Sequence, residues 1–448
     1  SVTFDYARCL AIDQYEGGYS LVDVFDDAKY LVVPEGGSVP KDLDDSIQVI
    51  QQPLNHIYLG ATAVMSLFDA IDALDHVSMT ALKESGWTVE NAAKRMREGK
   101  LVYAGKYNTP DYELILAQGC ELAIESTMIY HTPDVKEMLE ELGVPVLVDR
   151  SSYESNPLGR TEWIKLYGVL TGKEEAANAF FEKQKESVAE LENYSSTGKV
   201  AAFFYLTTDG KVVVRSSTDY VPSMIKMAGG VYAFDGVVDE DGKTSVSMTM
   251  ESFYEKARDA DYIIYNASID SSVKTIEDLI KKDEVLKEFK AVKNGACYTT
   301  GSSMYQRTDV IANMILDFHK VFTGQDTDQL EFLEKMKESE QEYDRFRKQQ
   351  RGARARAGEL SQGARQTPSA LDDGFCNLGG SVRFDYDFEH QYGKRASVRR
   401  RNREGHLQQG RQQDPDGYYL AHPPAADFDG CHFGRGTVPF RLHAPDLL

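Results

Sequence analysis

The sequence has few of the residues on which redox, metal and disulfide sites are built. Its 448 residues include five cysteines, nine histidines and two tryptophans. Cys9, Cys120 and Cys297 are too scattered for a CxxC pair, so no disulfide framework is predicted. The sequence also has no GxxxxGK[ST] phosphate loop, no HExxH motif and no GxSxG motif. An enzymatic function therefore has no catalytic constellation to support it.

Long apolar runs and basic charge are also scarce. No uninterrupted apolar stretch approaches the roughly 20 residues that a membrane-spanning helix needs. The first residues are polar and strand-like, without the apolar core of a signal peptide, so we expect the chain as given to be soluble, which is compatible with prior removal of a leader. The net charge of −21 argues against nucleic acid as a partner, because that affinity depends on Lys and Arg neutralising phosphates. The same charge weakens a polybasic membrane interpretation.

The use of lysine and arginine reverses near the C-terminal end. Residues 1–344 contain 25 Lys and 8 Arg and carry a net charge of −26, whereas residues 345–448 contain 2 Lys and 15 Arg and carry +5. The second region also lacks helical or strand periodicity, as RGARARAGELSQGARQ illustrates. Two interpretations at the protein level are a disordered Arg-rich appendage and a nucleic-acid-binding arm.

A third interpretation of this tail concerns the gene. If the reading frame is moved forward by one base from about Ala370, codons can be chosen that also encode a string resembling the start of a membrane permease. That string has one spanning helix and then a WHIRLPR segment before a small-residue-rich apolar helix. We hypothesise that the tail is an out-of-frame translation of a neighbouring gene. Codons incompatible with that string would contradict the idea.

Strand-like and helix-like segments alternate through the first 337 residues, which is typical of α/β units with largely parallel sheets. SLVDVF and KYLVVP, joined by DDA, predict an opening hairpin, and residues 173–194 predict one long helix of about 33 Å. The predicted fold is α/β, with two Rossmann-like lobes joined by a long rigid helix and a ligand cleft between the lobes. The expected parts are an N-terminal lobe at 1–158, a linker with the long helix at 159–197, a C-terminal lobe at 198–337 and the atypical tail at 338–448.

Several stretches in this order resemble a known family. They are AIESTMIYHTPDVKEMLEELGVPVLVDRSSYESNPLGRTEWIKLYGVLTGKEEAANAF, MIKMAGG, ARDADYIIYN and AVKNGACYTTGSSMYQRTD. Over about residues 20–337 the chain is similar to the substrate-binding proteins of ABC importers for iron-siderophore, haem and cobalamin cargo, the class III periplasmic binding proteins. The resemblance implies limited hinge motion and delivery to a membrane permease paired with an ATPase.

The same resemblance implies an extracytoplasmic, monomeric carrier without a cofactor of its own, whose small metal-chelate ligand brings iron or cobalt. A lipid anchor is expected from Gram-positive members of the family, although no lipobox surrounds Cys9. The runner-up function is a tetrapyrrole- or metallocofactor-handling enzyme of the chelatase or lyase class. Such an enzyme would need paired histidines and carboxylates in the cleft, and only His131 lies in the loops considered below.

Polar and aromatic residues follow four predicted strands, at the ends where α/β proteins bind ligands. The predicted ligand contacts are Met128, Tyr130, His131, Arg150, Tyr153, Arg160, Tyr220, Met304, Tyr305 and Arg307.

Each kind of residue in this set has a structural alternative. Arg150 and Arg160 offer a fork of donors for an anionic chelate or propionate, or they form structural ion pairs. The four tyrosines stack on a flat ligand or pack in the protein. His131 is an axial metal ligand or a capping or surface group. The two methionines contact the ligand or fill the core.

The resemblance also implies that one carboxylate on each lobe meets arginines of the permease. Asp134, after Pro133, stands near the expected place in the first lobe, although the helix macrodipole alone favours an acidic residue there. In the second lobe Gln306 stands where a carboxylate is expected, with Asp309 or Glu251 nearby. Asp134 and Glu251 are the predicted docking residues.

Overall fold

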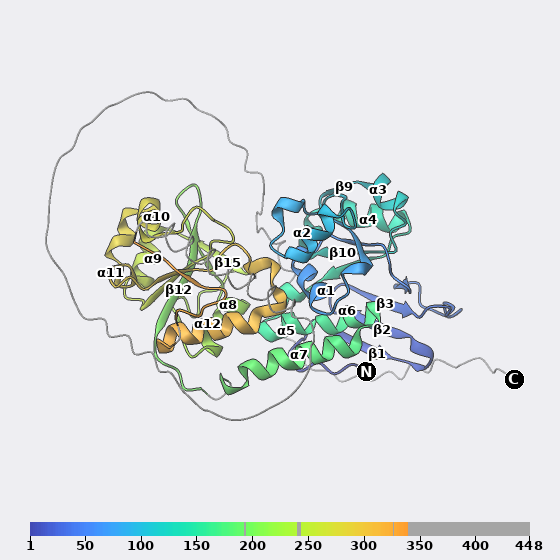
Figure 1. The fold of residues 1–448 in the computed structure, drawn as a ribbon, viewed down its shortest axis with the longest axis horizontal. Coiled ribbons are helices and arrows are strands. Elements are labelled where there is room, and N and C mark those ends of the chain that lie inside the picture. The colour runs from blue at the N-terminus through green and yellow to red at the C-terminus, as the bar shows by residue number, and fades with distance from the viewer. Residues whose placement is uncertain (192–193, 240–242, 326, 339–448) are drawn as a thin grey trace, which may run out of the picture. The chain divides into compact units, whose positions relative to one another are not determined.

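A computed structural model describes residues 1–191, 194–239, 243–325 and 327–338 of this chain (Figure 1). The interpretations of the tail, from residue 339 onward, lie outside the described residues. Within the described ranges, none of the helices combines the length and the apolar character needed to cross a membrane.

The chain begins with a small sheet in the order β1-β2-β3-β4. Its strands are β1 (Leu10–Gln14), β2 (Ser20–Val24), β3 (Ala28–Val33) and β4 (Ile47–Gln51). The first three strands are antiparallel and β4 runs parallel to β3, so the predicted hairpin of β2 and β3 is confirmed. In its turn Asp26 adopts a φ of +57°, a left-handed conformation that Asp tolerates better than most residues.

A second sheet has five parallel strands in the order β11-β10-β5-β6-β7. They are β5 (Ile57–Leu59), β6 (Val77–Thr80), β7 (Val102–Tyr103), β10 (Leu122–Ser126) and β11 (Val146–Asp149). Between them lie α1 (Met65–Ala70), α2 (Glu90–Arg97), the hairpin of β8 (Gly105–Lys106) and β9 (Thr109–Pro110), α3 (Tyr112–Ala117) and α4 (Pro133–Glu141). Leu122 and Ile124 of β10 belong to one core cluster and Ala123 to another, so both faces of this sheet are covered.

One detail of this region differs from the sequence prediction. The PDYELILAQG segment predicts a helix with proline in its first turn, but Pro110 belongs to β9 instead. The side chain of Asp111 accepts a hydrogen bond from the backbone N–H of Leu114 at 3.0 Å and caps α3. Asp is therefore the residue that starts the helix, because its carboxylate satisfies a first-turn N–H.

The third sheet follows the order β15-β13-β12-β16-β17-β18, with β14 also paired to β12. Its strands are β12 (Val200–Leu206), β13 (Val212–Arg215), β14 (Val231–Tyr232), β15 (Ser245–Met248), β16 (Tyr262–Tyr265), β17 (Cys297–Thr299) and β18 (Glu334–Lys335). The central strands β12, β16 and β17 are parallel, whereas β13, β15 and β18 are antiparallel to their neighbours. The helices of this part are α8 (Tyr220–Met227), α9 (Met250–Ala257), α10 (Ile276–Lys282), α11 (Lys290–Lys293) and α12 (Ile311–Thr323).

Three consecutive helices connect the second and third sheets along the chain: α5 (Pro157–Glu162), α6 (Ile164–Thr171) and α7 (Glu174–Val188). The long helix predicted over residues 173–194 is shorter in the structure, because α7 has 15 residues and continues as a 3-10 turn over Ala189–Leu191. Helices α6 and α7 pack closely at Gly168, where an added Cβ would lie 2.7 Å from the Cβ of Ala177. Figure 1 shows α7 as one straight rod.

Candidate functional site

The predicted ligand contacts follow strands, as the sequence indicates. Met128, Tyr130 and His131 lie in a 3-10 turn after β10, and Arg150 and Tyr153 lie at the turn after β11. Tyr220 begins α8 five residues after the end of β13, and Met304 and Tyr305 lie in a turn after β17. Arg160 lies in α5. These are the loops in which α/β proteins place ligand-binding groups.

Arg160 is a buried cation that stacks on an aromatic ring. Its side chain belongs to a residue that is 7% exposed, and the guanidinium carbon lies 4.0 Å from the centroid of the Tyr220 ring. The Nε atom is enclosed and has no hydrogen-bond partner among the described residues. Burial raises the pKa of the Tyr220 hydroxyl, and the positive charge of Arg160 partly opposes that effect.

Arg215, at the end of β13, is buried to a similar degree but is paired with a carboxylate. Its Nε and Nη2 atoms donate to Asp219 Oδ1 at 3.0 Å and to Oδ2 at 2.6 Å. Burial alone would lower the pKa of Arg215, but the negative charge of Asp219 more than offsets this and raises it. Asp219 also accepts a hydrogen bond from the backbone N–H of Val221 and so caps α8.

Asn266 directly follows β16 and orients Tyr305. Its Nδ2 atom donates to the Tyr305 hydroxyl oxygen at 2.8 Å, and its Oδ1 atom is buried without a partner in the described structure. Because the Tyr305 oxygen already accepts this hydrogen bond, the hydroxyl proton is free to be donated elsewhere. Tyr305 contributes, after the effect of burial, to raising the pKa of Tyr220, so the two side chains lie within electrostatic reach of each other.

We refer to Arg160, Arg215, Tyr220, Asn266 and Tyr305 as the Arg160 cluster. The sequence singles out three of these residues and misses Arg215 and Asn266. An arginine four residues before the capping Asp219, at the end of the KVVVRS strand, was an available signal for Arg215. A single asparagine after YIIY carries no comparable signal, because asparagine is common where strands end.

A second group of predicted residues contacts the turn between β2 and β3. Arg150 Nη1 donates to the backbone oxygen of Asp26 at 2.8 Å, and its guanidinium carbon lies 4.9 Å from the centroid of the Tyr153 ring. The Tyr130 hydroxyl donates to Asp27 Oδ1 at 3.0 Å. The Tyr130 hydroxyl and Arg150 Nη1 are thus engaged by the small N-terminal sheet, a contact that the sequence does not predict, whereas Arg150 Nε is buried without a hydrogen-bond partner among the described residues.

The remaining predicted contacts have mixed surroundings. Met304 is buried in the main core, Met128 is half-buried and His131 is exposed. Arg307 forms two hydrogen bonds to Asp309, at 2.9 and 3.0 Å. The described ranges contain no group of three or more His, Cys, Asp and Glu side chains that could hold a metal ion.

The two predicted docking carboxylates are both exposed in the first turn of a helix, Asp134 in α4 and Glu251 in α9. Asp309 is buried and paired with Arg307, so Glu251 is the accessible one of the two alternatives in that region. Gln306 has a different role. Its Oε1 accepts from the backbone N–H and the hydroxyl of Thr88 at 2.8 and 2.9 Å, and its Nε2 donates to the Gly86 oxygen at 2.8 Å.

Glu125, near the end of β10, is a buried carboxyl group that the sequence does not single out. The residue has no exposed surface, and neither carboxyl oxygen has a partner among the described residues. Its carboxyl group fills the space above Gly60, where an added Cβ would lie 2.1 Å from Oε2. Burial raises the pKa of Glu125 to about 8, so this group is largely protonated at neutral pH.

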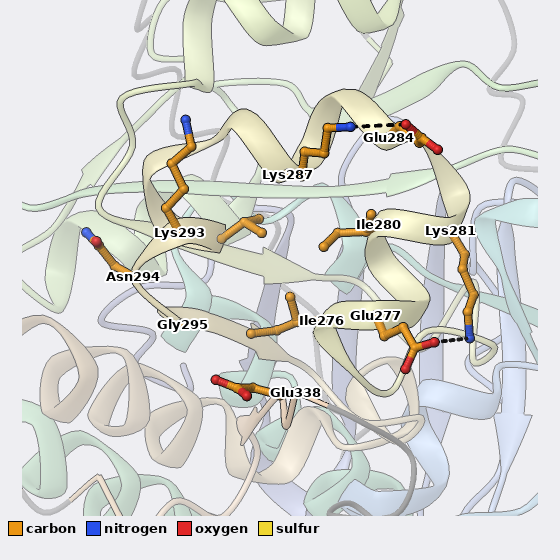
Figure 2. A pocket seen from close by; sticks show the side chains of 11 residues that line it. Ile276, Glu277, Ile280, Lys281, Glu284, Lys287, Lys293, Asn294, Gly295 and Glu338 are labelled. Carbon is orange, nitrogen blue, oxygen red and sulfur yellow. Dashed lines mark hydrogen bonds and ion pairs between the residues drawn. The ribbon is translucent and has the colours of Figure 1, made fainter. Parts of the chain in front are cut away.

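A separate open groove lies along α10 and α11 (Figure 2). Ile276 and Ile280 line it, and charged side chains surround them. Lys281 pairs with Glu277 at 3.2 Å and Lys287 pairs with Glu284 at 3.1 Å, and Figure 2 marks both pairs with dashed lines. None of the predicted ligand contacts lines this groove. Its charges are largely balanced, so it offers less to a charged ligand than the Arg160 cluster does.

Comparison with known proteins identifies relatives over most of the described chain. A model of the periplasmic binding protein family matches residues 62–304, just over half of the sequence. This range contains the Arg160 cluster except Tyr305, which directly follows it. Two uncharacterized lipoproteins of Methanocaldococcus jannaschii are 26% and 28% identical over 339 and 321 residues, covering 70% and 68% of this chain and 79% of each relative. The solved structure of a periplasmic heme-binding protein from Vibrio cholerae has a TM-score of 0.47 at 16% identity, covering 58% of this chain and 96% of that one.

Proposed function

Since this chain belongs to the periplasmic binding protein family, we propose that it captures an iron chelate, haem or a corrinoid outside the cytoplasm and delivers it to an ABC importer. Members of the family are solute-binding proteins, so the chain is a carrier and not an enzyme. The chelatase or lyase interpretation is therefore set aside. The cargo class and the binding residues form the proposed part of this function.

The observation that carries the proposal is the unpaired guanidinium of Arg160 among tyrosines. A buried cation without a carboxylate partner destabilises a folded protein, because its hydration is lost without full compensation. Within the described chain the Tyr220 ring is the partner of Arg160, and cation–π attraction offsets part of that cost. A ligand group that binds the guanidinium would compensate the rest of this lost hydration.

The tyrosines of the cluster suit the proposed cargo. Tyr305 and Tyr205 of β12 are half-buried and lie within electrostatic reach of each other, whereas Tyr220 is 4% exposed and its ring stacks on Arg160. Phenol rings give flat contact surfaces at a low cost in side-chain entropy, which suits rigid macrocycles and aromatic chelates. Iron or cobalt would arrive within the cargo, because the proposal needs no metal ligand from the protein.

Delivery requires a contact with the permease. We assign Asp134 and Glu251 to this contact, because both carboxylates are exposed and can meet basic residues of a partner. The name lipoprotein, carried by two relatives, supports a lipid anchor for this protein as well. Such an anchor would hold a monomeric carrier close to the importer.

The proposal is tested by titrating the protein with ferric haem, cyanocobalamin and a neutral ferric trihydroxamate. Tryptophan fluorescence reports binding, since Trp163 is fully buried three residues after Arg160. We expect saturable 1:1 binding of at least one ligand, which is then recovered with an unchanged visible spectrum. Arg160→Gln should weaken that binding. The matched control is Arg258→Gln, which removes an exposed arginine whose guanidinium carbon lies 5.7 Å from the Tyr254 ring centroid. Binding of none of the ligands, or their chemical conversion, would contradict the proposal.

A further inference from the structure

We infer that residues 5–9 form a strap that positions α5, the helix that carries Arg160, and that Glu154 and Glu162 are the positioning residues that hold this strap. The inference rests on the proposed function in one respect, because the consequence of releasing the strap is weaker cargo binding. The strap precedes the family range of residues 62–304 and contains none of the predicted ligand contacts.

Glu162, the last residue of α5, binds three consecutive backbone N–H groups of the strap. Its Oε1 accepts from Asp5 at 2.8 Å, and its Oε2 accepts from Tyr6 at 2.7 Å and from Ala7 at 2.8 Å. The glutamate has no exposed surface, and its Oε1 also accepts from Lys165 Nζ at 2.8 Å. Consecutive N–H groups that converge on one carboxylate form an anion-binding nest, so the first half of the strap is shaped around this side chain.

Glu154, three residues before α5, holds the second half of the strap in a similar way. The backbone N–H of Arg8 donates to both carboxyl oxygens, at 3.0 and 2.9 Å, and that of Cys9 donates to Oε1 at 2.9 Å. The indole Nε1 of Trp163 donates to the same Oε1, also at 2.9 Å. Two buried carboxylates near opposite ends of α5 thus bind the backbone N–H groups of all the residues 5–9.

Between these two carboxylates the strap lies directly on the backbone of α5. A Cβ added to Gly159 would lie 3.1 Å from the Tyr6 carbonyl oxygen and 3.3 Å from the Ala7 Cα atom, which is tighter than most Cβ contacts. Glycine therefore allows this close approach. The helix also contacts the chain that follows β17, where Thr161 Oγ1 donates to the Thr308 oxygen at 2.8 Å. The strap and that segment thus both restrain α5.

The strap also joins α5 to the turn between β2 and β3. The carbonyl oxygen of Cys9 accepts a hydrogen bond from the backbone N–H of Phe25 at 3.0 Å. The backbone oxygen of the next residue, Asp26, accepts from Arg150. Residues 5–9 therefore connect the two groups of predicted ligand contacts, one on α5 and one at this turn.

The strap is either attached or detached as a unit, because partial release is costly. A glutamate that stayed buried without its N–H partners would keep a charge that neither water nor hydrogen bonds stabilise. Attachment of the strap is therefore coupled to the ordering of α5. By thermodynamic linkage, a cargo molecule that binds the ordered helix must in turn stabilise the attached strap.

The first step of the test uses the ligand-free full chain and amide hydrogen exchange. Glu162→Gln replaces one acceptor oxygen with a donor, and Gly159→Ala displaces the strap without altering either carboxylate. We expect exchange at residues 158–163 to become at least about ten-fold faster in both variants, whereas exchange in β5 and β10 stays unchanged. Glu175→Gln, which replaces an exposed glutamate in the first turn of α7, is the matched control and should behave as wild type does.

The second step titrates wild type and the same variants with ferric haem, cyanocobalamin and the neutral ferric trihydroxamate. Both strap variants should bind the ligand that wild type binds at least about ten-fold more weakly. Glu175→Gln should bind it with unchanged affinity. The same ligand should slow exchange at residues 5–9 of the wild-type protein, although none of these residues is a predicted ligand contact.

Unchanged exchange at residues 158–163 in the variants would overturn the inference. Equally faster exchange in β5 and β10 would also overturn it, because the loss of stability would then be global. If Glu162→Gln does not fold, the comparison of Gly159→Ala with wild type decides alone. Equal ligand affinity of wild type and variants removes the inference and leaves the proposed function intact. Faster exchange in α5 without binding of any of the three ligands to wild type removes the proposed cargo and leaves the positioning of α5 by the strap.

Discussion

The guanidinium carbon of Arg160 lies 4.0 Å from the centroid of the Tyr220 ring, and this aromatic contact takes the place of a salt bridge. Arg215, which is equally buried in the same cluster, is held instead by two hydrogen bonds to Asp219. The two arginines thus separate two roles. Arg215 stabilises the loop that begins α8, and Arg160 keeps its charge for a ligand.

This difference predicts that the two arginines contribute unequally to stability. Arg215→Met leaves Asp219 as a buried carboxylate without a cationic partner, so we expect the free energy of unfolding to fall by about 3–5 kcal/mol. Arg160→Met removes an unpaired cation and keeps an apolar side chain against Tyr220, so we expect that free energy to change by less than about 1 kcal/mol or to rise. Urea denaturation of both variants and wild type measures the difference. An equally large loss in both would show that Arg160 has a structural partner.

Glu125 predicts a pH-dependent stability. Burial raises the pKa of its carboxyl group in the folded protein to about 8, from an ordinary value of 4.5. Between these two pKa values the folded state holds a proton that the unfolded chain releases. The stability that this proton contributes is fully present below pH 4.5 and is lost as the pH rises through 8. Glu125→Gln cannot ionise. We expect the free energy of unfolding of the variant, relative to that of wild type, to increase by a few kcal/mol between about pH 5 and about pH 9. One unit of pKa shift corresponds to about 1.4 kcal/mol. Denaturation curves at several pH values that run parallel for the two proteins would contradict this.

The site was only partly predictable from the sequence. A residue pattern indicates whether a segment is a helix or a strand more reliably than it indicates which segments pack against it. Alternating apolar residues around DDA give the β2–β3 hairpin, but nothing local shows that Asp26 reaches Arg150. KVVVRS predicts a strand, yet its antiparallel pairing with β12 depends on the whole sheet. Arg160 is a sequence candidate because a guanidinium offers a fork of donors for an anionic ligand, whereas its lack of a carboxylate partner is a property of the packed structure.

Gln306 joins the turn after β17 to the segment before α2 and should restrain both. Gln306→Ala removes three hydrogen bonds to Thr88 and Gly86, so we expect a loss of about 1–2 kcal/mol in the free energy of unfolding. Amide hydrogen exchange should become faster at residues 86–88, with the exposed Gln325→Ala as the matched control. Unchanged exchange at these residues would show that the contact does not order the segment.

Substitution of the two exposed docking carboxylates should impair delivery without changing ligand binding. Asp134→Arg and Glu251→Arg should leave ligand affinity unchanged, because both residues are exposed at helix starts and lie outside the Arg160 cluster. Uptake through the importer should fall by about ten-fold, because the reversed charge repels a basic partner surface. Glu113→Arg, an exposed acidic residue in the first turn of α3, is the control. Uptake that falls equally in all three variants would point to a general charge effect.

The position of a bound chelate tests the central claim most directly. A crystal of the protein with the tightest-binding cargo, measured at the absorption edge of iron or cobalt, locates the metal by anomalous scattering without prior assumptions. The account predicts one strong peak, bordered by Arg160, Tyr220 and Tyr305, with an acceptor group of the cargo on the guanidinium. A peak in the groove along α10 and α11, or at another surface away from these three side chains, would contradict it.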